Sequence, residues 1–508
     1  MSKVAPIFPS STRMRRVSLE RMARLSADVW KKRGEQMALG LARYALQHVP
    51  AYRAHVKNIL TGRVRAPETL AQFAKLPLVT KQGYLRAHSY TDLFPPLGLH
   101  SATTVSATSG STGEPFFFPR GPEHDLFYER SLELLLKRQW GVGSRSTLVI
   151  IGFGLGIWIG GIFTYKNLNK LAEGELPMTV IPVGPNKELF LKSFTRFAEH
   201  YDQIILMGYP PFIKDLLDAG ARDGIDWRSH RLRILTAAEG YSERFRNHLA
   251  EVSGADPVSD FVNIYGTVEQ GTVAHETALA NMIRRISLDR PEVFKLLFPK
   301  AQNVPTLAQY FPDHVYFEEV DGQVVATGYG SSIPLIRYAF SDLGGVIQYD
   351  EMREKLALCG IQLDREIKKH GIGSMVMQLP FVYVYARADF VIIFRGAKIY
   401  PEELRNALDN PIFGKVLTGR LSAERIECAD LSQRLDIHVE LSVKTKPSAR
   451  LEKQIRNHLV AELRAKNSEF ANNYAHDAAA STPRIVLHKY EDPAYFGGPG
   501  KQRWVKKV

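Results

Sequence analysis

The feature that most constrains the fold of this 508-residue chain is an alternation of apolar and amphipathic segments between residues 147 and 269. Apolar runs of strand length alternate there with segments of helical periodicity, which predicts a mostly parallel sheet with covering helices. The expected strands lie within 147–151, 178–184, 203–211, 232–240 and 260–269, and the expected helices are 187–200, 211–220 and 241–253. Because parallel strands present functional loops at their carboxyl ends, the turns that end these strands should meet at one crevice.

The segments outside this alternation predict further helices and a second, smaller domain. The expected elements are helices at 17–58 with Pro50 as a stop, a helix at 123–140, a hairpin around Asp321-Gly322 and one charged amphipathic helix at 350–370. From Pro401 the pattern is helix, strand, strand, helix, strand. We therefore predict an α/β fold with a large N-terminal domain at 1–388, including a helical region at 1–75, and a small C-terminal α+β domain at 389–508.

The stretch Ser106–Pro115 reads SATSGSTGEP and is a candidate anion site. Its hydroxyl residues alternate with glycines, so main-chain N–H and side-chain O–H donors can point at one spot, as a nucleotide triphosphate requires. The candidate residues are Thr108, Ser109, Gly110, Ser111, Thr112 and Gly113. The stretch lacks the Gly-Lys-Ser/Thr ending of a Walker A loop, which disfavours that class. An ordinary Ser/Gly surface loop is the structural alternative.

Charge is concentrated near the N-terminus. The formal net charge is +13, and residues 1–65 contain 14 Lys/Arg against 3 Asp/Glu. Such a region could attract nucleic acid, an acidic membrane or an acidic carrier protein. No aromatic residues are interleaved for base stacking, so a solvated helical surface is the simpler interpretation and we expect no nucleic acid as partner.

Cysteine content and hydropathy indicate a cytoplasmic protein without a membrane anchor. Cys359 and Cys428 are the two cysteines, far apart in the chain, which excludes a disulfide framework and a cysteine-based zinc site and suits a reducing compartment. No apolar run follows the N-terminal arginines, so no signal peptide is expected. Residues 146–165 carry no charged side chain and are long enough to span a membrane. Their five glycines favour a different interpretation, a buried strand that continues into a glycine loop.

The stretch TSGSTGEP resembles the phosphate loop of the adenylate-forming superfamily, and its residue pattern is most similar to that of the phenylacetate-CoA ligase branch. HVPAYRAHV at 48–56 and LPLVTK at 76–81 are similar to the opening of those ligases. The resemblance extends over roughly residues 40–505. It implies an ATP-dependent activity with Mg²⁺ and with coenzyme A as co-substrate.

The resemblance assigns nucleotide contacts to three further motifs. YGTVE at 265–269 is similar to the family's YGxSE or YGxTE, so Tyr265 would stack on adenine, Gly266 would let the chain pass the nucleotide, and Glu269 would bind Mg²⁺. Val268 stands where the family has a hydroxyl, which puts that contact in doubt. Ala238 and Glu239 match the adenine turn, Asp342 in IRYAFSDLG matches the ribose acceptor, and Arg387 matches the arginine that contacts ribose or phosphate.

The resemblance also assigns a hinge and a catalytic lysine. Asp389 falls at the family's hinge, where a rotating small domain would serve adenylation and then attack by a thiol, and Phe390 replaces the second Asp common there. Lys501 in GGPGKQRW matches the terminal lysine, whose ammonium would bridge carboxylate and α-phosphate. Lys506 and Lys507 lie close by, so a solvated basic tail is the alternative.

The expected reaction is activation of a carboxylic acid to an acyl-adenylate with release of pyrophosphate, followed by thioester formation with coenzyme A. By the same resemblance Phe153, Trp158 and Tyr209 would line the acyl pocket, which favours an aryl or apolar acid; core packing is the alternative for each aromatic. Transfer to a carrier protein or an amine is the nearest rival, and a degenerate nucleotide-binding protein without turnover is another. Some family members pair through N-terminal helices, so a homodimer is also an expectation.

Overall fold

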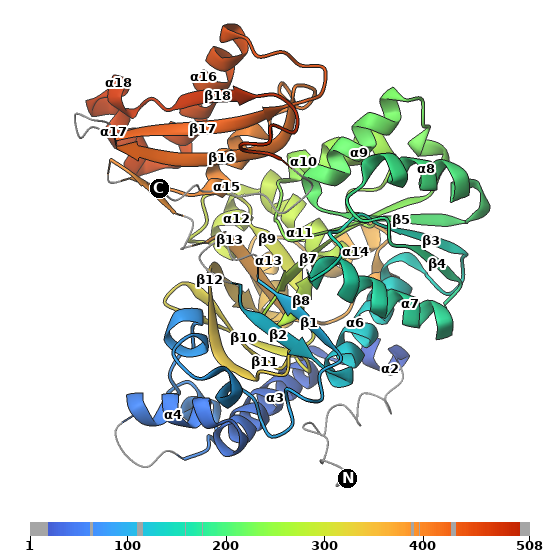
Figure 1. Ribbon diagram of the computed structural model, residues 1–508, viewed down its shortest axis with the longest axis vertical. Coiled ribbons are helices and arrows are strands. Elements are labelled where there is room, and N and C mark those ends of the chain that lie inside the picture. Colours follow the sequence, from blue (N-terminus) through green and yellow to red (C-terminus); the bar gives the residue numbers. More distant parts are fainter. Residues whose placement is uncertain are drawn as a thin grey trace.

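The computed structural model describes residues 19–60, 65–108, 115–157, 159–174, 176–387, 391–395, 397–427 and 433–497. Within this part of the chain the largest sheet has 11 strands in the order β10-β11-β12-β13-β9-β8-β7-β6-β5-β3-β4 (Figure 1). The strands are β3 (Thr147–Ile151), β4 (Met178–Ile181), β5 (Gln203–Gly208), β6 (Leu232–Ala237), β7 (Phe261–Thr267), β8 (Gly271–His275), β9 (Thr306–Gln309), β10 (Val315–Val320), β11 (Gln323–Gly328), β12 (Leu335–Ile347) and β13 (Phe381–Arg387).

This sheet has a parallel part and an antiparallel part. The pairs β4–β3, β3–β5, β5–β6 and β6–β7 are parallel, as the alternation predicts. From β7 to β10 every neighbouring pair is antiparallel. The predicted α/β class is confirmed, and the antiparallel strands extend the parallel ones to form one continuous sheet.

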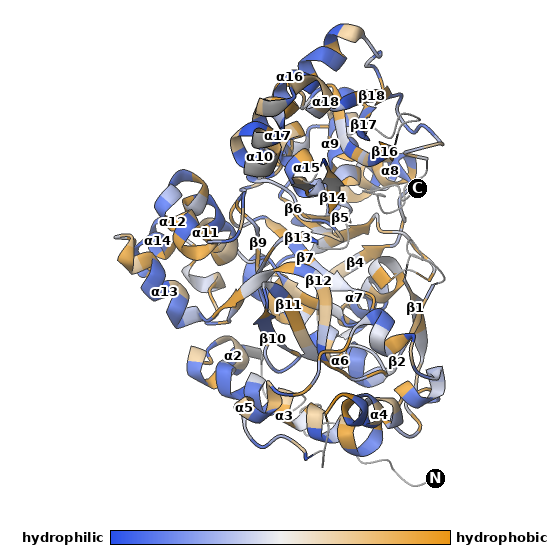
Figure 2. Cartoon of the chain, turned by 90° about the vertical axis from the view of Figure 1, so that its left-hand side faces the viewer, coloured by the Kyte–Doolittle hydropathy of each residue, from blue (hydrophilic) through white to orange (hydrophobic). Residues whose placement is uncertain are grey.

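Helices cover both parts of the sheet. They are α2 (Leu19–Ala23), α3 (Ala27–His48), α4 (Pro50–Ile59), α5 (Leu70–Phe73), α6 (Pro122–Trp140), α7 (Thr164–Gly174), α8 (Lys187–Phe197), α9 (Pro210–Arg222), α10 (Glu243–Ser253), α11 (Ala278–Asp289), α12 (Pro291–Leu297), α13 (Tyr349–Leu358) and α14 (Leu363–Lys369). One core lies between α6, α7 and the parallel strands, and a second lies between those strands and α8, α9 and α10. Figure 2 shows hydrophobic residues along the central strands and a mixture of both kinds on the surrounding helices.

The C-terminal elements have a core of their own. They are β14 (Ile392–Phe394), β15 (Ala397–Ile399), α15 (Pro401–Leu408), β16 (Leu417–Glu427), β17 (Gln433–Leu441), α16 (Ala449–Lys466), α17 (Ser468–His476), α18 (Ala478–Ser481) and β18 (Arg484–His488). A three-stranded sheet, β16-β17-β18, packs with these helices around residues drawn from 392–485. We call the described residues from 391 to 497 the lid. The predicted boundary and hinge at Asp389 lie outside the described residues.

One local prediction is confirmed and another needs correction. Helix α3 ends at His48, just before Pro50 as predicted, and Pro50 then begins α4, because proline suits the first turn of a helix, where its missing N–H is not needed. The segment 350–370 is two helices, α13 and α14, separated at Gly360, whose φ of 74° interrupts a helix. The hairpin turn is confirmed: Asp321 and Gly322 both have positive φ between β10 and β11.

In the described part of the chain no helix is long and apolar enough to cross a membrane.

We expect the large domain to lose stability as the pH falls below about 6.5, the ordinary pKa of histidine. Burial lowers the pKa of His275 to about 4, and burial together with the charge of Arg120 lowers the pKa of His124 to about 3. The unfolded state then binds more protons below pH 6.5, so stability is full above that pH and declines as the pH approaches the folded pKa values. At pH 5 the loss is about 2 kcal/mol for each histidine.

Urea unfolding at pH 7 and pH 5 measures this dependence. His275→Phe should reduce it, because the His275 ring packs on Phe311 and its buried Nε2 has no hydrogen-bond partner. The matched variant His200→Phe changes an exposed histidine and should leave it unchanged. Equal stability of the wild type at both pH values would contradict the prediction.

Candidate nucleotide and acyl-acid site

Asp342 and Arg387 form the centre of the candidate site. The antiparallel register of β12 and β13 places the two residues opposite each other, and Arg387 Nε lies 3.2 Å from Asp342 Oδ1. Ser341, directly before Asp342, has φ of 64°, a left-handed conformation that non-glycine residues seldom adopt. Such local strain is typical of positions that orient a functional side chain. The Asp342 side chain is nearly buried, and it faces the charge of this guanidinium.

Tyr265 joins this pair from the carboxyl end of β7. Its hydroxyl donates to Asp342 Oδ2 at 2.5 Å, and its ring packs between Phe317 and Phe340. Burial raises the pKa of Tyr265 well above its usual value, and the Asp342 carboxylate raises it further, so the phenol stays protonated and remains a donor. At Gly266 an added Cβ would lie 3.0 Å from the Gly271 carbonyl oxygen, so a side chain would fit this turn only if the backbone shifted by a few tenths of an ångström.

Glu269 belongs to the same cluster. The hydroxyl of Tyr338 donates to Glu269 Oε1 at 3.5 Å, and the Tyr338 ring contacts Phe340, which in turn contacts Tyr265. Glu269 is therefore connected to Asp342 through a chain of three aromatic residues, each of which contacts the next. Val268, which replaces the expected hydroxyl residue, packs its side chain against the core under this cluster.

Arg120 fixes the turn that carries Glu269, and no motif in the sequence predicts this role. Its side chain is fully buried, and it donates to the carbonyl oxygens of Val268, of Gly330 at 2.9 Å and of Phe118 at 3.2 Å. Burial lowers the pKa of Arg120 to about 10, while the Glu269 carboxylate acts in the opposite direction. Arg120 thus remains a cation at neutral pH beneath the proposed metal ligand.

The hydroxyl-rich stretch begins at the end of a short hairpin, β1 (Thr104–Ala107) with β2 (Phe117–Arg120). Thr108 Oγ1 accepts from the Phe116 amide at 3.0 Å and from Lys81 Nζ at 3.4 Å, so Thr108 closes the base of the loop. Residues 109–113 lie outside the described residues. Two residues before Lys81, Val79 pairs with Tyr338 of β12, which brings the base of the loop beside the Glu269 cluster.

The turn after β6 contacts the lid. Ala238 has φ of 76° and is exposed, whereas Glu239 is buried. Glu239 Oε2 accepts from Arg405 of α15 at 2.9 Å, and Arg405 also donates to the Gly240 carbonyl oxygen. Asn263 holds the turn from below by donating to the Glu239 carbonyl oxygen at 2.9 Å. In this arrangement the Glu239 carboxylate forms an ion pair with the lid.

Phe153 and Tyr209 follow two neighbouring parallel strands, β3 and β5, and contact each other. Their ring centroids are 5.4 Å apart in an edge-to-face arrangement. Phe153 is 1% exposed and belongs to the core around α6 and α7, whereas Tyr209 is partly buried. Trp158, the third predicted wall residue, lies outside the described residues, as do the predicted hinge Asp389 and the predicted catalytic Lys501.

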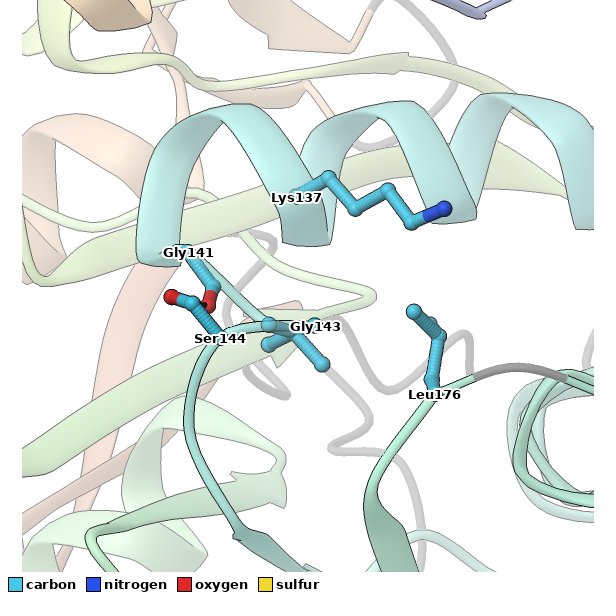
Figure 3. A pocket seen from close by; sticks show the side chains of 6 residues that line it. Lys137, Gly141, Gly143, Ser144 and Leu176 are labelled. Carbon is cyan, nitrogen blue, oxygen red and sulfur yellow. Dashed lines mark hydrogen bonds between the residues drawn. The ribbon is translucent and has the colours of Figure 1, made fainter.

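The described residues contain no group of three or more His, Cys, Asp or Glu side chains that could hold a metal ion. A magnesium ion needs fewer protein ligands, because it usually binds one or two carboxylates and takes its other ligands from water and substrate phosphates. Glu269, near the base of the predicted phosphate loop, fits that requirement. One open pocket, lined by Lys137, Gly141, Gly143, Ser144 and Leu176, lies at the amino-terminal ends of β3 and β4 and includes none of the predicted site residues (Figure 3).

By fold, these elements are similar to solved structures of an acyl-CoA ligase. The chain is similar over its whole length to 2-hydroxyisobutyryl-CoA ligase in the postadenylation state in complex with 2-HIB-AMP, with a TM-score of 0.66, 16% sequence identity and 94% of that chain covered. Its similarity to the same ligase in the thioesterification state, in complex with 2-HIB-AMP and CoA, has a TM-score of 0.53 at 16% identity and covers 96% of this chain and 91% of that chain. Neither a family model nor a curated protein matches the sequence.

Proposed function

We propose that this protein activates a carboxylic acid with ATP and then transfers the acyl group to the thiol of coenzyme A. The observation that carries the proposal is the continuous cluster that runs from Glu269 through Tyr338, Phe340 and Tyr265 to Asp342 and Arg387. Residues from three strands, β7, β12 and β13, and from the β7–β8 turn contact each other there. The shared fold with an acyl-CoA ligase supports the same reaction.

The proposed chemistry assigns each member of the cluster a task. Asp342 would accept hydrogen bonds from both ribose hydroxyls, and Arg387 would hold its carboxylate and contact ribose or phosphate. Tyr265 would lie against adenine beside Gly266 and the Ala238–Glu239 turn. The residues 108–113 would bind the phosphates, and Glu269 would hold Mg²⁺, which when bound neutralises phosphate charge.

Two group transfers follow from this arrangement. In the first, the acid's carboxylate oxygen forms a bond to the α-phosphorus and pyrophosphate leaves, while Lys501 would balance the charge that develops between them. In the second, the thiolate of coenzyme A forms a bond to the acyl carbon and AMP leaves. Phe153 and Tyr209, with Trp158, are proposed as walls of the acyl pocket, which favours an aryl or apolar acid as in the phenylacetate-CoA ligase branch.

Pyrophosphate release over a panel of aryl, aliphatic and hydroxy acids tests the first step. We expect acid-dependent release that Lys501→Ala lowers and the matched variant Lys506→Ala leaves unchanged. Nucleotide binding without release by any acid would favour a degenerate binding protein. Mass spectrometry of mixtures that contain coenzyme A, an acyl carrier protein and amines then identifies the acceptor, and an amide or a carrier-bound acyl group would replace the coenzyme A assignment.

A further inference from the structure

Helix α9 of the large domain carries a lysine whose hydrogen bonds hold the lid. Lys214 Nζ donates to Asp218 Oδ2 on its own helix at 2.8 Å and to two lid carbonyl oxygens, those of Gly414 at 2.9 Å and Leu417 at 3.1 Å. An ammonium group has three donors, so all three protons of Lys214 are used. The side chain is only 5% exposed, so these hydrogen bonds form in a largely dry contact.

Two neighbouring residues lower the pKa of Asp218. Although burial alone would raise its pKa, the hydrogen bond from His248 at 2.9 Å and the charge of Lys214 lower the pKa of Asp218 below its usual value. The carboxylate therefore stays ionised and accepts a hydrogen bond from Lys214 beside the lid. Hydrogen bonds from a charged donor contribute more than neutral ones, and they cost most when one partner is removed from a buried site.

The next residue of α9 binds a second segment of the lid. Asp215 Oδ2 accepts from the Tyr490 hydroxyl at 2.5 Å and from Lys187 Nζ at 2.9 Å, and Lys187 also lies over the Tyr490 ring. Two consecutive residues of one helix thus hold two lid segments that lie more than 70 positions apart in the chain. Figure 1 shows the lid, in orange and red, beside α9 and α10.

This orientation of the lid is coupled to the candidate site. Arg405 of α15 binds Glu239 and Gly240 in the predicted adenine turn, and one helical turn further along Asp409 accepts from Ser242 at 2.8 Å. Over 100% of its length the chain superimposes on the ligase in the postadenylation state with a TM-score of 0.66, and over 96% on the same ligase in the thioesterification state with a TM-score of 0.53. The hydrogen bonds of Lys214 thus occur in an overall arrangement closer to the first of these two states.

We propose that Lys214 is a positioning residue that stabilises the lid in the arrangement used for acyl-adenylate formation and so sets the balance between the two half-reactions. The proposal rests on the proposed acid-activating function. A lid that alternates between two arrangements responds to any contact made in only one of them, and the contacts of Lys214 with Gly414 and Leu417 must break when the lid rotates. The hydrogen-bond partners of Lys214 are Asp218, Gly414 and Leu417, and none of them belongs to the cluster around Asp342 or to the predicted acyl-pocket residues.

The first experiment measures the half-reactions separately in Lys214→Met, which keeps the length of the side chain but removes its charge. Acid-dependent exchange between ATP and pyrophosphate reports adenylation, and thioester formation from supplied acyl-adenylate and coenzyme A bypasses it. We expect exchange to fall by about tenfold while thioester formation stays within about twofold of wild type. The matched variant Lys192→Met, on the exposed surface of α8, should change neither rate.

The second experiment measures the lid orientation without turnover. Spin labels at Glu199 and Gln454, two exposed positions on the large domain and the lid, report their separation in a Cys359→Ser, Cys428→Ser background. We expect a wider distance distribution in Lys214→Met than in wild type, with Lys192→Met unchanged. An unchanged distribution, or a parallel loss of both half-reactions, would overturn the role of Lys214. If no acid supports exchange in wild type, the proposed function fails and the label distances alone decide the role of Lys214.

Discussion

Asp342→Asn should raise the KM for ATP by about 100-fold or more while leaving the fold intact, because two charge-assisted hydrogen bonds to ribose, worth about 1.5–3 kcal/mol each, are lost. The substitution keeps the shape of a side chain that is 4% exposed, so its contacts with Tyr265 and Arg387 can partly persist. What changes is the negative charge that pairs with the Arg387 guanidinium and that the proposed hydrogen bonds to ribose require.

Steady-state kinetics with ATP and with dATP varied at a saturating acid test this directly. Asp321→Asn is the matched control, because Asp321 lies in the β10–β11 turn with a positive φ that asparagine adopts readily. Thermal midpoints establish that each variant is folded. An unchanged KM for ATP in a folded Asp342→Asn enzyme would remove Asp342 from the nucleotide site.

Gly330→Ala should destabilise the large domain by about 3 kcal/mol and also reduce adenylation. A Cβ at Gly330 would lie 1.8 Å from the Gln270 carbonyl oxygen, and backbone atoms cannot move aside as a flexible side chain can. The Gly330 carbonyl also accepts from Arg120, which holds the carbonyl of Val268 next to Glu269. The added methyl group would therefore displace the turn that carries the proposed metal ligand.

Gly40→Ala is the matched control, and its expected change in stability has the opposite sign. Gly40 lies in the interior of α3, and an added Cβ there has no neighbour within 4 Å. Alanine loses less backbone freedom than glycine when a helix forms, so this variant should be more stable by about 0.5–1 kcal/mol. Urea unfolding of the two variants beside the wild type gives both values. Equal stability of Gly330→Ala and wild type would show that the β11–β12 connection can move away from Gln270.

The candidate site shows how far sequence reasoning extends. Tyr265, Glu269, Asp342 and Arg387 were chosen by their motifs, and the structure brings all four into one cluster. Arg120 and Arg405 were missed. Each makes contacts with segments more than 140 positions away, and nothing in the neighbouring sequence of either residue indicates that partner. Lys81 belongs to the LPLVTK motif, but the motif does not predict its hydrogen bond to Thr108, which the tertiary structure shows.

The sequence alone determined the parallel strands β3 to β7, the helices α8, α9 and α10 and the hairpin turn at Asp321-Gly322, because periodicity and turn chemistry act over a few neighbouring residues. Only the tertiary structure decided that β8 to β13 continue the sheet in antiparallel pairs, that α13 and α14 are separate helices, and that Lys214 and Arg405 join the lid to the large domain. Those outcomes depend on pairing and burial between segments far apart in the chain. The free energy of such contacts belongs to the folded arrangement as a whole, and no local pattern encodes it.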